Sequence, residues 1–481
     1  MQRSSFITKI AKRTWVRSYS TIYALSSAPG KAGVAVIRVS GPQAKKALTE
    51  TVRGTTPLEP RQAYFRRIRH PVTNMLLDRG LVFWFPGPNS FTGEDSVEFH
   101  VHGGNAVVKS VLEALGSLDQ FRLAEQGEFS KRAFDNDKLD LTEIEGLADL
   151  LNAETEAQRQ LALRQAEGGL RKPYEEWRNK IIQCMAVTEA VIDFGEDEHI
   201  EDGVLDQVLD NVIELRDAIQ YHLNDSRVGE IVRSGVRVAI VGPPNAGKST
   251  LLNLLAKREA AIVSDTPGTT RDIVEVTLNL GGYPVVISDT AGLRKSNDNI
   301  EMEGVKRAMS RMDLADIKIC LLPLTQNEID PIVQQVLDPD TFVILTKQDL
   351  VTTPNCSNNT TTLLEKSILD QLQKKGVQKI WTLSCKTGQG VDRFLNDMID
   401  VLKSTFDDAL ASPALITQAR HRQHLQDCLV GLENYLALPQ DEVVLGAEEL
   451  RYAANALGRI TGRVDVEDVL DVLFSQFCIG K

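Results

Sequence analysis

The spacing of apolar residues changes character along this chain of 481 residues. In residues 21–138 the apolar runs are short and are separated by Gly- and Pro-rich turns. These runs predict strands at 33–39, 81–85 and 96–101, and a helical period follows at 106–115. The mixture predicts a small α+β domain.

From Leu141 to about Arg233 the apolar positions recur with the period of a helix. One such stripe is formed by Trp177, Ile181, Cys184, Thr188 and Val191. The same signal returns near the C-terminus in Val443, Ala447, Leu450, Ala454 and Leu457. These stripes are typical of the core faces of packed helices. Because one helical layer precedes the central segment and another follows it, we predict a helical domain with a second domain inserted into it.

The central segment alternates strands with helices. Apolar runs at 236–241, 285–287, 342–345 and 380–383 predict strands of an α/β domain, and a polar stretch at 355–362 predicts a surface loop.

The loop after the first of these strands carries the most informative motif, Gly242-Pro243-Pro244-Asn245-Ala246-Gly247-Lys248-Ser249. A Gly-rich loop between a strand and a helix cradles a triphosphate with its backbone N–H groups. Lys248 reaches the β- and γ-phosphates, and the Ser249 hydroxyl can bind Mg²⁺. The alternative is a chance match in a glycine-containing loop, which the flanking strand and helix disfavour.

Four further motifs follow in the order that a GTPase requires. In Gly268-Thr269-Thr270-Arg271-Asp272 a loop can bring Thr270 to Mg²⁺, and Asp289-Thr290-Ala291-Gly292 offers a carboxylate for a Mg²⁺-bound water and an N–H for the γ-phosphate. In Thr346-Lys347-Gln348-Asp349 the Asp349 carboxylate can accept two hydrogen bonds from the guanine edge, which selects GTP over ATP. Ser384-Cys385-Lys386 would close over the base. Each motif alone is weak, but five in order are strong.

These motifs complete the predicted organisation. The fold class is an α+β N-terminal domain, an α-helical middle domain and an inserted α/β P-loop (Ras-like) GTPase domain. The expected segments are a presequence at 1–20, the N-terminal domain at 21–140, the GTPase domain at 236–405, and the helical domain in two parts, 141–235 and 406–481.

Two positions depart from the usual GTPase pattern. The base-reading motif begins with Thr346 in place of Asn, so we expect a weaker tie between the base loop and the P-loop. Leu293 stands where Ras-like enzymes carry the Gln that orients the attacking water. The nearby acids Asp298, Glu301 and Glu303 can take over this role, and composition alone singles out none of them.

Composition excludes some classes of protein. A net charge of −12 and a sequence pI of about 5.3 disfavour an autonomous nucleic-acid binder, but they leave room for a local basic patch or a nucleic-acid-binding partner. No run approaches the ~18 apolar residues of a transmembrane helix. The six scattered cysteines contain no CxxC pair, which indicates a reducing compartment rather than a zinc site or a disulfide framework. His100 and His102 share a strand face, where packing or hydrogen bonding is favoured over metal ligation because no third ligand is apparent.

Both ends of the chain carry signals. Residues 1–20 hold five basic residues and many Ser and Thr, and no acid precedes Glu50. This amphipathic, acid-free segment is typical of a mitochondrial presequence and predicts a matrix protein, the alternative being a basic tail that stays in place. At the other end, Phe474, Phe477 and Ile479 could anchor the terminus and so deliver Cys478 and Lys481 to a defined place, although a free tail is the default.

The sequence closely resembles the TrmE/MnmE family of tRNA-modification GTPases, specifically its mitochondrial members, over nearly everything after residue 20. Besides the P-loop, the resemblance rests on Pro86-Gly87-Pro88-Asn89-Ser90-Phe91-Thr92-Gly93-Glu94-Asp95, Gly127-Glu128-Phe129-Ser130, Asn136-Asp137-Lys138-Leu139-Asp140-Leu141, Asp289-Thr290-Ala291-Gly292-Leu293-Arg294 and Phe477-Cys478-Ile479-Gly480-Lys481.

The resemblance implies a 5-formyl-tetrahydrofolate or related folate in an N-terminal domain that also forms a homodimer. Matching folate positions are Arg38, Glu98 and Lys138, with Lys481 reaching the same pocket and Cys478 matching a functionally implicated cysteine. The family's G domains pair around K⁺, whose matching ligands are Asn245, Ser264, Thr266 and Thr269, and its water-orienting acid matches Glu301. With an FAD-dependent partner of the MnmG/GidA type, the family installs an aminomethyl-type group at C5 of the wobble uridine of certain tRNAs, here mitochondrial tRNAs.

The complete set of nucleotide-binding candidates follows from these motifs. It comprises Gly242, Asn245, Ala246, Gly247, Lys248, Ser249, Thr250, Ser264, Asp265, Thr266, Pro267, Gly268, Thr269, Thr270, Asp289, Thr290, Ala291, Gly292, Thr346, Lys347, Gln348, Asp349, Ser384, Cys385 and Lys386.

A ribosome-assembly GTPase of the Era/Der type is the main alternative function. Such proteins usually carry a basic RNA-binding module after the G domain, whereas here a helical layer and a Cys-Ile-Gly-Lys tail follow it. A membrane-remodelling GTPase is a third possibility, for which no lipid-binding basic helix is visible.

Overall fold

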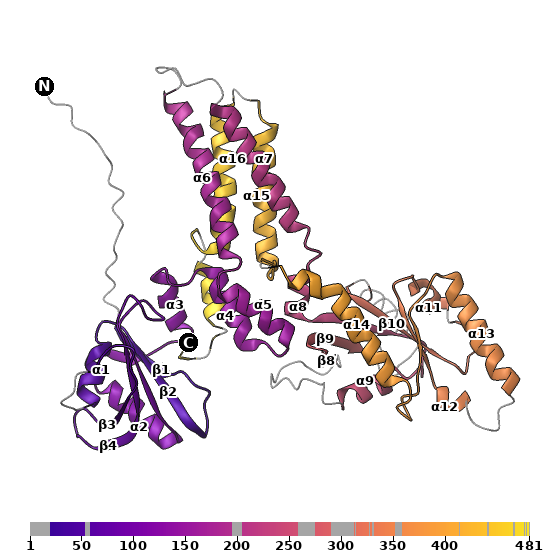
Figure 1. Ribbon diagram of the computed structural model, residues 1–481, viewed down its shortest axis with the longest axis horizontal. Helices are drawn as coiled ribbons and strands as arrows, with labels where there is room; N and C mark the ends of the chain where they lie inside the picture. Colours follow the sequence, from indigo (N-terminus) through magenta and orange to yellow (C-terminus); the bar gives the residue numbers. More distant parts are fainter. Residues whose placement is uncertain are drawn as a thin grey trace, which may run out of the picture. The chain divides into compact units, whose positions relative to one another are not determined.

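The computed structural model describes residues 20–52, 58–194, 204–257, 275–289, 312, 314–326, 328–329, 331–351, 358–412, 414–439, 442–464, 467–475, 477 and 479–480 (Figure 1). The chain divides into two compact units, one formed by Met1–Ile144 with Asp465–Lys481 and the other by Glu145–Val464.

The first unit is built on a six-stranded sheet with the order β3-β4-β5-β2-β1-β6. Its elements are β1 (Thr21–Leu25), β2 (Ala32–Ser40), α1 (Ala44–Thr51), β3 (Tyr64–Arg69), β4 (Leu76–Phe85), β5 (Ser96–Gly103), α2 (Asn105–Gly116), β6 (Phe121–Leu123) and α3 (Glu128–Asp135). The three predicted strands and the predicted helix are confirmed, although β4 begins at Leu76 rather than at residue 81. All pairings are antiparallel except that of β1 with β6.

Side chains alternate across this sheet as a pleated strand requires. On β5, Val97, Phe99 and Val101 are buried in a core that includes residues of α1 and α2. The intervening Glu98 and His100 are only partly buried and point to the opposite face, where the candidate cofactor residues lie.

The C-terminal tail is held on this unit by a buried side chain and by hydrogen bonds to its backbone. After α17 (Glu467–Phe474), Phe477 is buried with 2% of its surface exposed. Ile479 makes an antiparallel bridge with Gln126, and the Ser26 hydroxyl donates to the Gly480 carbonyl at 2.8 Å. The default expectation of a free tail is therefore wrong for the described tail residues, and the possible anchor is present in Phe474 and Phe477, which are buried, whereas the Ile479 side chain is 59% exposed.

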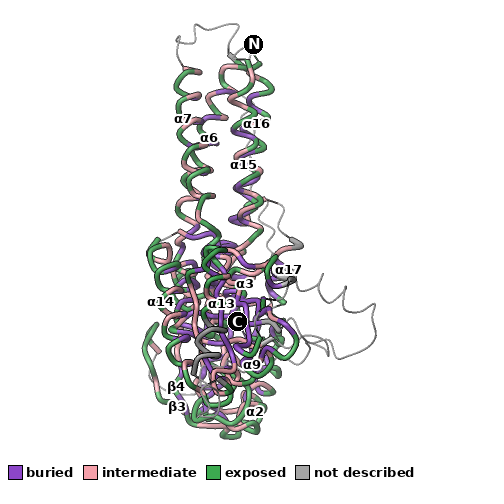
Figure 2. Tube along the Cα trace, turned by 90° about the vertical axis from the view of Figure 1, so that its right-hand side faces the viewer, coloured by how far each residue is buried: buried purple, intermediate pink, exposed green. Residues whose placement is uncertain are grey.

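The second unit contains a helical bundle assembled from two distant segments. It consists of α6 (Arg171–Phe194), α7 (Val204–Leu223), α15 (Ala419–Ala437) and α16 (Val443–Thr461). Two further helices precede it, α4 (Leu141–Asn152), which begins in the first unit, and α5 (Glu156–Ala166), whose buried side chains pack into the core of the inserted domain. Residues from α6, α7, α15 and α16 share one apolar core, which confirms that a helical layer before the inserted domain packs on a layer after it. Figure 2 shows buried positions along these helices interleaved with exposed ones, as amphipathic helices require.

The inserted domain has a second six-stranded sheet with the order β12-β11-β10-β7-β9-β8. Its elements are α8 (Val228–Ser234), β7 (Val236–Val241), α9 (Lys248–Ala256), β8 (Glu275–Leu280), β9 (Tyr283–Asp289), β10 (Ile317–Pro323), α11 (Pro331–Val336), β11 (Phe342–Thr346), α12 (Gln348–Val351), α13 (Asn358–Lys374), β12 (Ile380–Thr382) and α14 (Val391–Leu410). All strands are parallel except β8, which pairs antiparallel with β9.

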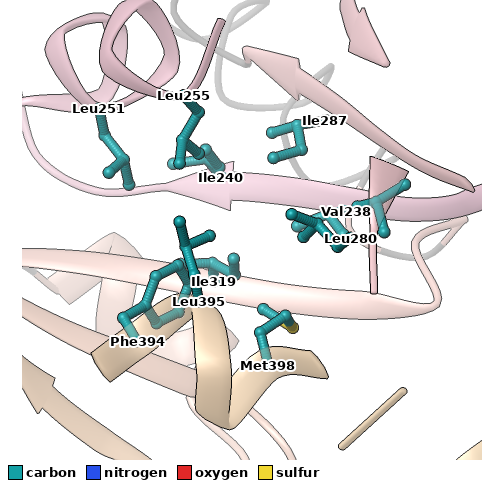
Figure 3. A pocket seen from close by; sticks show the side chains of 11 residues that line it. Val238, Ile240, Leu251, Leu255, Leu280, Ile287, Ile319, Phe394, Leu395 and Met398 are labelled. Carbon is teal, nitrogen blue, oxygen red and sulfur yellow. The ribbon is translucent and has the colours of Figure 1, made fainter. Parts of the chain in front are cut away.

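One apolar core of this domain lies between the sheet and the helices α9 and α14. In Figure 3, residues such as Leu251, Ile319 and Phe394 converge from these elements, and every side chain that lines the void between them is apolar. This space is therefore part of the packed core and carries no ligand-binding groups.

The predicted surface loop at 355–362 is wrong for its second half, because α13 begins at Asn358. Polar Asn and Thr are poor helix formers in isolation but are well tolerated at a helix N-terminus. Further along the helix, Ile368 and Leu372 are buried in a core with residues of β10 and β11. Tertiary packing of this face outweighs the weak local propensity.

His222 on α7 provides a test of the packing in the bundle. Its Nε2 lies 3.1 Å from the Tyr174 hydroxyl, and burial lowers the pKa of His222 to about 4. An unfolded histidine has a pKa of about 6.5, so below that pH the unfolded chain binds a proton that the folded chain does not. The free energy of unfolding should fall by about 2 kcal/mol between pH 7.5 and pH 5 from this residue alone.

Urea unfolding followed by tryptophan fluorescence measures this effect, because the Trp177 ring centroid lies 5.4 Å from that of His222. His222→Gln keeps a partner for the Tyr174 hydroxyl but cannot titrate, so its stability should depend less steeply on pH. Parallel pH profiles for the two proteins would contradict a neutral, buried His222.

Candidate functional site

The P-loop adopts a shape that its sequence imposes. At Gly242, a Cβ atom would lie 2.4 Å from the Leu321 carbonyl oxygen, so the close approach of β10 requires glycine. The Ala246 N–H donates to the Pro243 carbonyl at 3.2 Å, and Gly247 follows with a φ of 100°, a left-handed value that favours glycine. The turn delivers the chain to the N-terminus of α9.

The groups that would bind a phosphate lie at the N-terminus of α9. The Lys248 ammonium donates to the carbonyls of Gly242 at 2.7 Å and Pro243 at 3.0 Å, which holds it over the loop. Ser249 and Thr250 are exposed in the first turn of α9. A cation, hydroxyls and the N–H groups of a helix N-terminus are the donor set that binds a phosphate.

The two base-side motifs also come together. The Ser384 hydroxyl donates to Asp349 Oδ1 at 2.7 Å, which orients the carboxylate at the start of α12. Lys347 has a left-handed φ of 64° that turns the chain from β11 into this helix. Cys385 is partly buried, and burial together with the charge of Asp349 raises the pKa of its thiol, while Lys386 is exposed.

Thr346 ties the base loop to the P-loop, which the sequence led us not to expect. Its hydroxyl, almost fully buried at the end of β11, donates to the Ala246 carbonyl at 2.7 Å. The expected weak tie is therefore replaced by a short, buried hydrogen bond. The same peptide unit carries the Gly247 N–H on its other side, so holding the Ala246 carbonyl also sets the direction of that donor.

Part of the predicted site lies outside the described residues. This holds for Ser264, Asp265, Thr266, Pro267, Gly268, Thr269, Thr270, Thr290, Ala291, Gly292, Glu301, Cys478 and Lys481, as well as for Leu293 and the presequence up to residue 19. The backbone of Asp289 is described and ends β9, next to β7 in the sheet. The backbone of β9 thus reaches the same edge of the sheet as the P-loop.

Two candidate cofactor residues of the first unit, Arg38 and Glu98, lie side by side on the sheet face that also packs against Phe129 of α3. Arg38 and Glu98 are direct cross-strand partners on β2 and β5, and the Arg38 Nε donates to Glu98 Oε1 at 3.0 Å. About one fifth of each side chain is exposed. The Arg38 guanidinium lies over the rings of Phe91 at 5.1 Å and Phe129 at 5.8 Å.

Lys138 lies against the loop that carries Phe91. The side chain is exposed, and its Cγ lies beside Gly93, in the same loop that carries Phe91. Among the described residues, no hydrogen bond or ion pair joins Lys138 to Arg38 or Glu98.

Sequence reasoning missed three neighbours of this pair, the rings of Phe91 and Phe129 and the imidazole of His100. His100 Nε2 lies 3.3 Å from Glu98 Oε2, while His102 Nδ1 lies 2.8 Å from Asp78. Both histidines therefore lie within hydrogen-bonding distance of carboxylates, and in the described part of the chain no group of three or more His, Cys, Asp or Glu could hold a metal ion. Because side chains two residues apart on a strand share a face, the sequence of β5 could have predicted that His100 lies next to Glu98.

The fold and the two base-side motifs define a P-loop GTPase whose G domain is inserted into a helical bundle. Comparison with protein families extends this description to most of the chain. Residues 141–478 match the MnmE helical domain, and residues 21–138 match the GTP-binding protein TrmE N-terminus. The chain therefore belongs to the MnmE/TrmE family of tRNA modification GTPases.

Similar proteins cover the chain from end to end. It is 47% identical to the mitochondrial 5-taurinomethyluridine-[tRNA] synthase subunit GTPB3 of Danio rerio, over 100% of this chain and 97% of that protein. It is 45% identical to the Homo sapiens protein of the same name, over 96% and 94% of the two chains. The tRNA modification GTPase MnmE of Parvibaculum lavamentivorans is 49% identical, over 96% and 100%. These matches favour tRNA modification over the ribosome-assembly alternative.

Membership in this family makes the protein a GTP-binding GTPase, as Asp349 led us to expect. None of the described helices combines the length and the apolar character needed to cross a membrane.

The Thr346 hydrogen bond yields a prediction about nucleotide affinity. Thr346→Val keeps the shape of the side chain but leaves the buried Ala246 carbonyl without its donor, at a cost of about 1–2 kcal/mol. GDP and GTP should bind roughly 5- to 30-fold more weakly, chiefly through faster release. Dissociation of a fluorescent guanine nucleotide measures the rate. Thr346→Ser retains the hydroxyl and should stay near the parent value, whereas a Val variant that releases nucleotide at the parent rate would remove Thr346 from the site.

Proposed function

We propose that the protein acts in the mitochondrial matrix, where it uses GTP hydrolysis to modify C5 of the wobble uridine of mitochondrial tRNAs. It works with an FAD-dependent partner of the MnmG/GidA type and a tetrahydrofolate one-carbon donor. The observation that carries the proposal is the presence, in one chain, of a GTP-selective P-loop domain and a sheet face with a partly exposed guanidinium–carboxylate pair under an aromatic ring. The names of the mitochondrial relatives, which describe synthase subunits, support both the substrate and the need for a partner.

The nucleotide site has the residues that Mg²⁺-dependent hydrolysis needs. Ser249 and Thr270 would hold the metal ion, which offsets phosphate charge, while Lys248 and the loop N–H groups bind the phosphates. Since Leu293 cannot orient water, Glu301 takes this role as a general base or positioning group.

A second cation explains how the chain works without an arginine finger. Asn245 is exposed in the P-loop with a left-handed φ of 59°, so its side-chain oxygen is available to a K⁺ ion. Oxygens of Ser264, Thr266 and Thr269 complete the set. Positive charge at this place stabilises the charge that develops during phosphoryl transfer.

The sheet face of the first unit that carries Arg38 and Glu98 suits a folate. Glu98 offers a carboxylate to the hydrogen-bonding edge of a pterin, Phe91 offers a ring for stacking, and Arg38, Lys138 and Lys481 offer charge to folate carboxylates. Val34 on β2 and Phe91 are also exposed, by 56% and 36%. The exposed Phe91 ring beside the Arg38–Glu98 pair supports closure of this site by a second copy in a homodimer.

Dependence on K⁺ is the first test. Replacing K⁺ with Na⁺ at equal ionic strength should slow GTP hydrolysis roughly 10- to 100-fold, because a transition-state charge loses its counterion, while nucleotide binding stays nearly intact. The measurement is phosphate release at saturating GTP with binding followed in parallel. Equal turnover in both salts would exclude this use of Asn245.

A substitution in the C-terminal tail distinguishes tRNA modification from GTP hydrolysis. Cys478→Ser should leave GTP hydrolysis unchanged and abolish modification of wobble uridines, because no step of GTP hydrolysis requires a thiol. Mass spectrometry of mitochondrial tRNA from a deletion strain that carries the variant provides the measurement.

The wild-type gene must restore the modification in the same strain, and unmodified uridines in that control would refute the proposed function itself. If Cys478 were only a small packed side chain, stability and both activities would fall together. Normal wobble uridines with Cys478→Ser would refute the role of the thiol.

A further inference from the structure

An arginine-rich hairpin forms one edge of the sheet in the first unit. Strands β3 and β4 lie at the end of the order β3-β4-β5-β2-β1-β6. Residues 59–85 contain five arginines, namely Arg61, Arg66, Arg67, Arg69 and Arg79, but only two acids, Glu59 and Asp78. The hairpin is therefore basic in a chain whose net charge is −12.

The charge of these arginines is not neutralised locally. In the described part of the chain none of the five forms an ion pair. Three of them donate only to backbone carbonyls, Arg61 to Asn89, Arg66 to Phe65 and Arg69 to Asn74. The carboxylate of Asp78 is held instead by the backbone N–H and the imidazole of His102, both at 2.8 Å. The hairpin thus presents uncompensated positive charge to solvent.

Two of the arginines stand directly opposite each other. Arg67 and Arg79 are cross-strand partners in the β3–β4 register, and both are exposed. Like charges at opposed positions destabilise a strand pair. Charges on an edge strand can also guard against aggregation, but Arg79 belongs to β4, which is paired on both sides. Edge protection can account for Arg67 on β3 but not for Arg79 on β4, and the unfavourable pairing of like charges points to a ligand.

An aromatic ring completes the surface. Phe65 lies two residues before Arg67 on the same face of β3, is 64% exposed, and has Leu81 of β4 as its cross-strand partner. Guanidinium groups interleaved with an exposed aromatic ring are the chemistry that binds unpaired nucleotides, through phosphate contacts and base stacking.

We propose that this hairpin is a tRNA-binding surface, on which Arg67 and Arg79 contact backbone phosphates and Phe65 stacks on an unpaired base. The proposal rests on the proposed function and identifies where the substrate touches this chain. A second copy of the protein fits less well, because a two-fold contact here would set arginines against arginines. An anionic lipid surface shares the phosphate chemistry and is distinguished by the test.

Arg67→Glu is the decisive variant. It reverses one charge and converts an unfavourable cross-strand pair into a favourable one with Arg79, so the sheet should fold at least as well as before. The matched control is Lys109→Glu on α2, an equal charge change at a side chain that is 77% exposed. The full-length proteins are titrated with an unmodified mitochondrial tRNA transcript at several salt concentrations.

Arg67→Glu should weaken tRNA binding roughly tenfold and lower the slope of log affinity against log salt by about one, because a phosphate contact is lost. Phe65→Ala should weaken binding several-fold without changing the slope. Lys109→Glu should bind tRNA like the parent, and all three variants should keep the parent's GTP hydrolysis.

Three results would overturn the proposal. The first is parent-like tRNA binding by Arg67→Glu, or no measurable tRNA binding by the parent. The second is that Arg67→Glu loses binding to phosphatidylserine vesicles but not to tRNA. The third is a change in its sedimentation coefficient with unchanged tRNA affinity, which would assign the hairpin to self-association. Failure of the proposed function is seen separately, as unmodified wobble uridines despite normal tRNA binding.

Discussion

The structure depends on a charged clamp that holds together the two chain segments leading into and out of the G domain. Arg422 of α15 binds Asp225 and Glu230 at 2.6 Å and the Leu223 carbonyl at 2.8 Å. Next to Glu230 in the sequence, Gly229 approaches the Ile416 carbonyl so closely that a Cβ atom on residue 229 would lie 2.3 Å from that oxygen. A domain can be inserted into another only where the ends of the insert lie close together, and here fixed bonds keep them there.

A second set of buried charges fixes α4 against the first turn of α15. Glu145 is within 2.7 Å of His421 Nε2 and 2.9 Å of an Arg420 nitrogen. Burial opposes the charged form, but His421 and Arg420 outweigh it and lower the pKa of Glu145. One turn further along α4, Asp149 accepts a hydrogen bond from Arg233, which lies three residues before the first residue of β7. Strand β7, which leads into the P-loop, thus follows a segment that is hydrogen-bonded to α4, and this contact fixes the position of the strand.

Sequence patterns predicted the architecture well because its elements have strong periodicity. The strands at 33–39 and 96–101 and the paired helical layers appear where the apolar residues place them. Predictions failed where a contact between distant residues decides the outcome. The Thr346 hydroxyl reaches Ala246 only because β11 and the P-loop meet in space, and α13 starts at Asn358 because its later turns are buried. Neither fact is visible in a local window of sequence.

The net charge of the whole chain does not determine which ligand a local surface binds. The acidic composition favoured a chain that leaves RNA binding to a partner, yet charge acts over a Debye length of about 8 Å at physiological salt, far less than the dimensions of this protein. A ligand at the β3–β4 hairpin would therefore respond to Arg67 and Arg79 and not to acids on distant helices. Electrostatic screening permits one acidic chain to keep a basic surface, so the distribution of charge, rather than its sum, decides which partners this protein can hold.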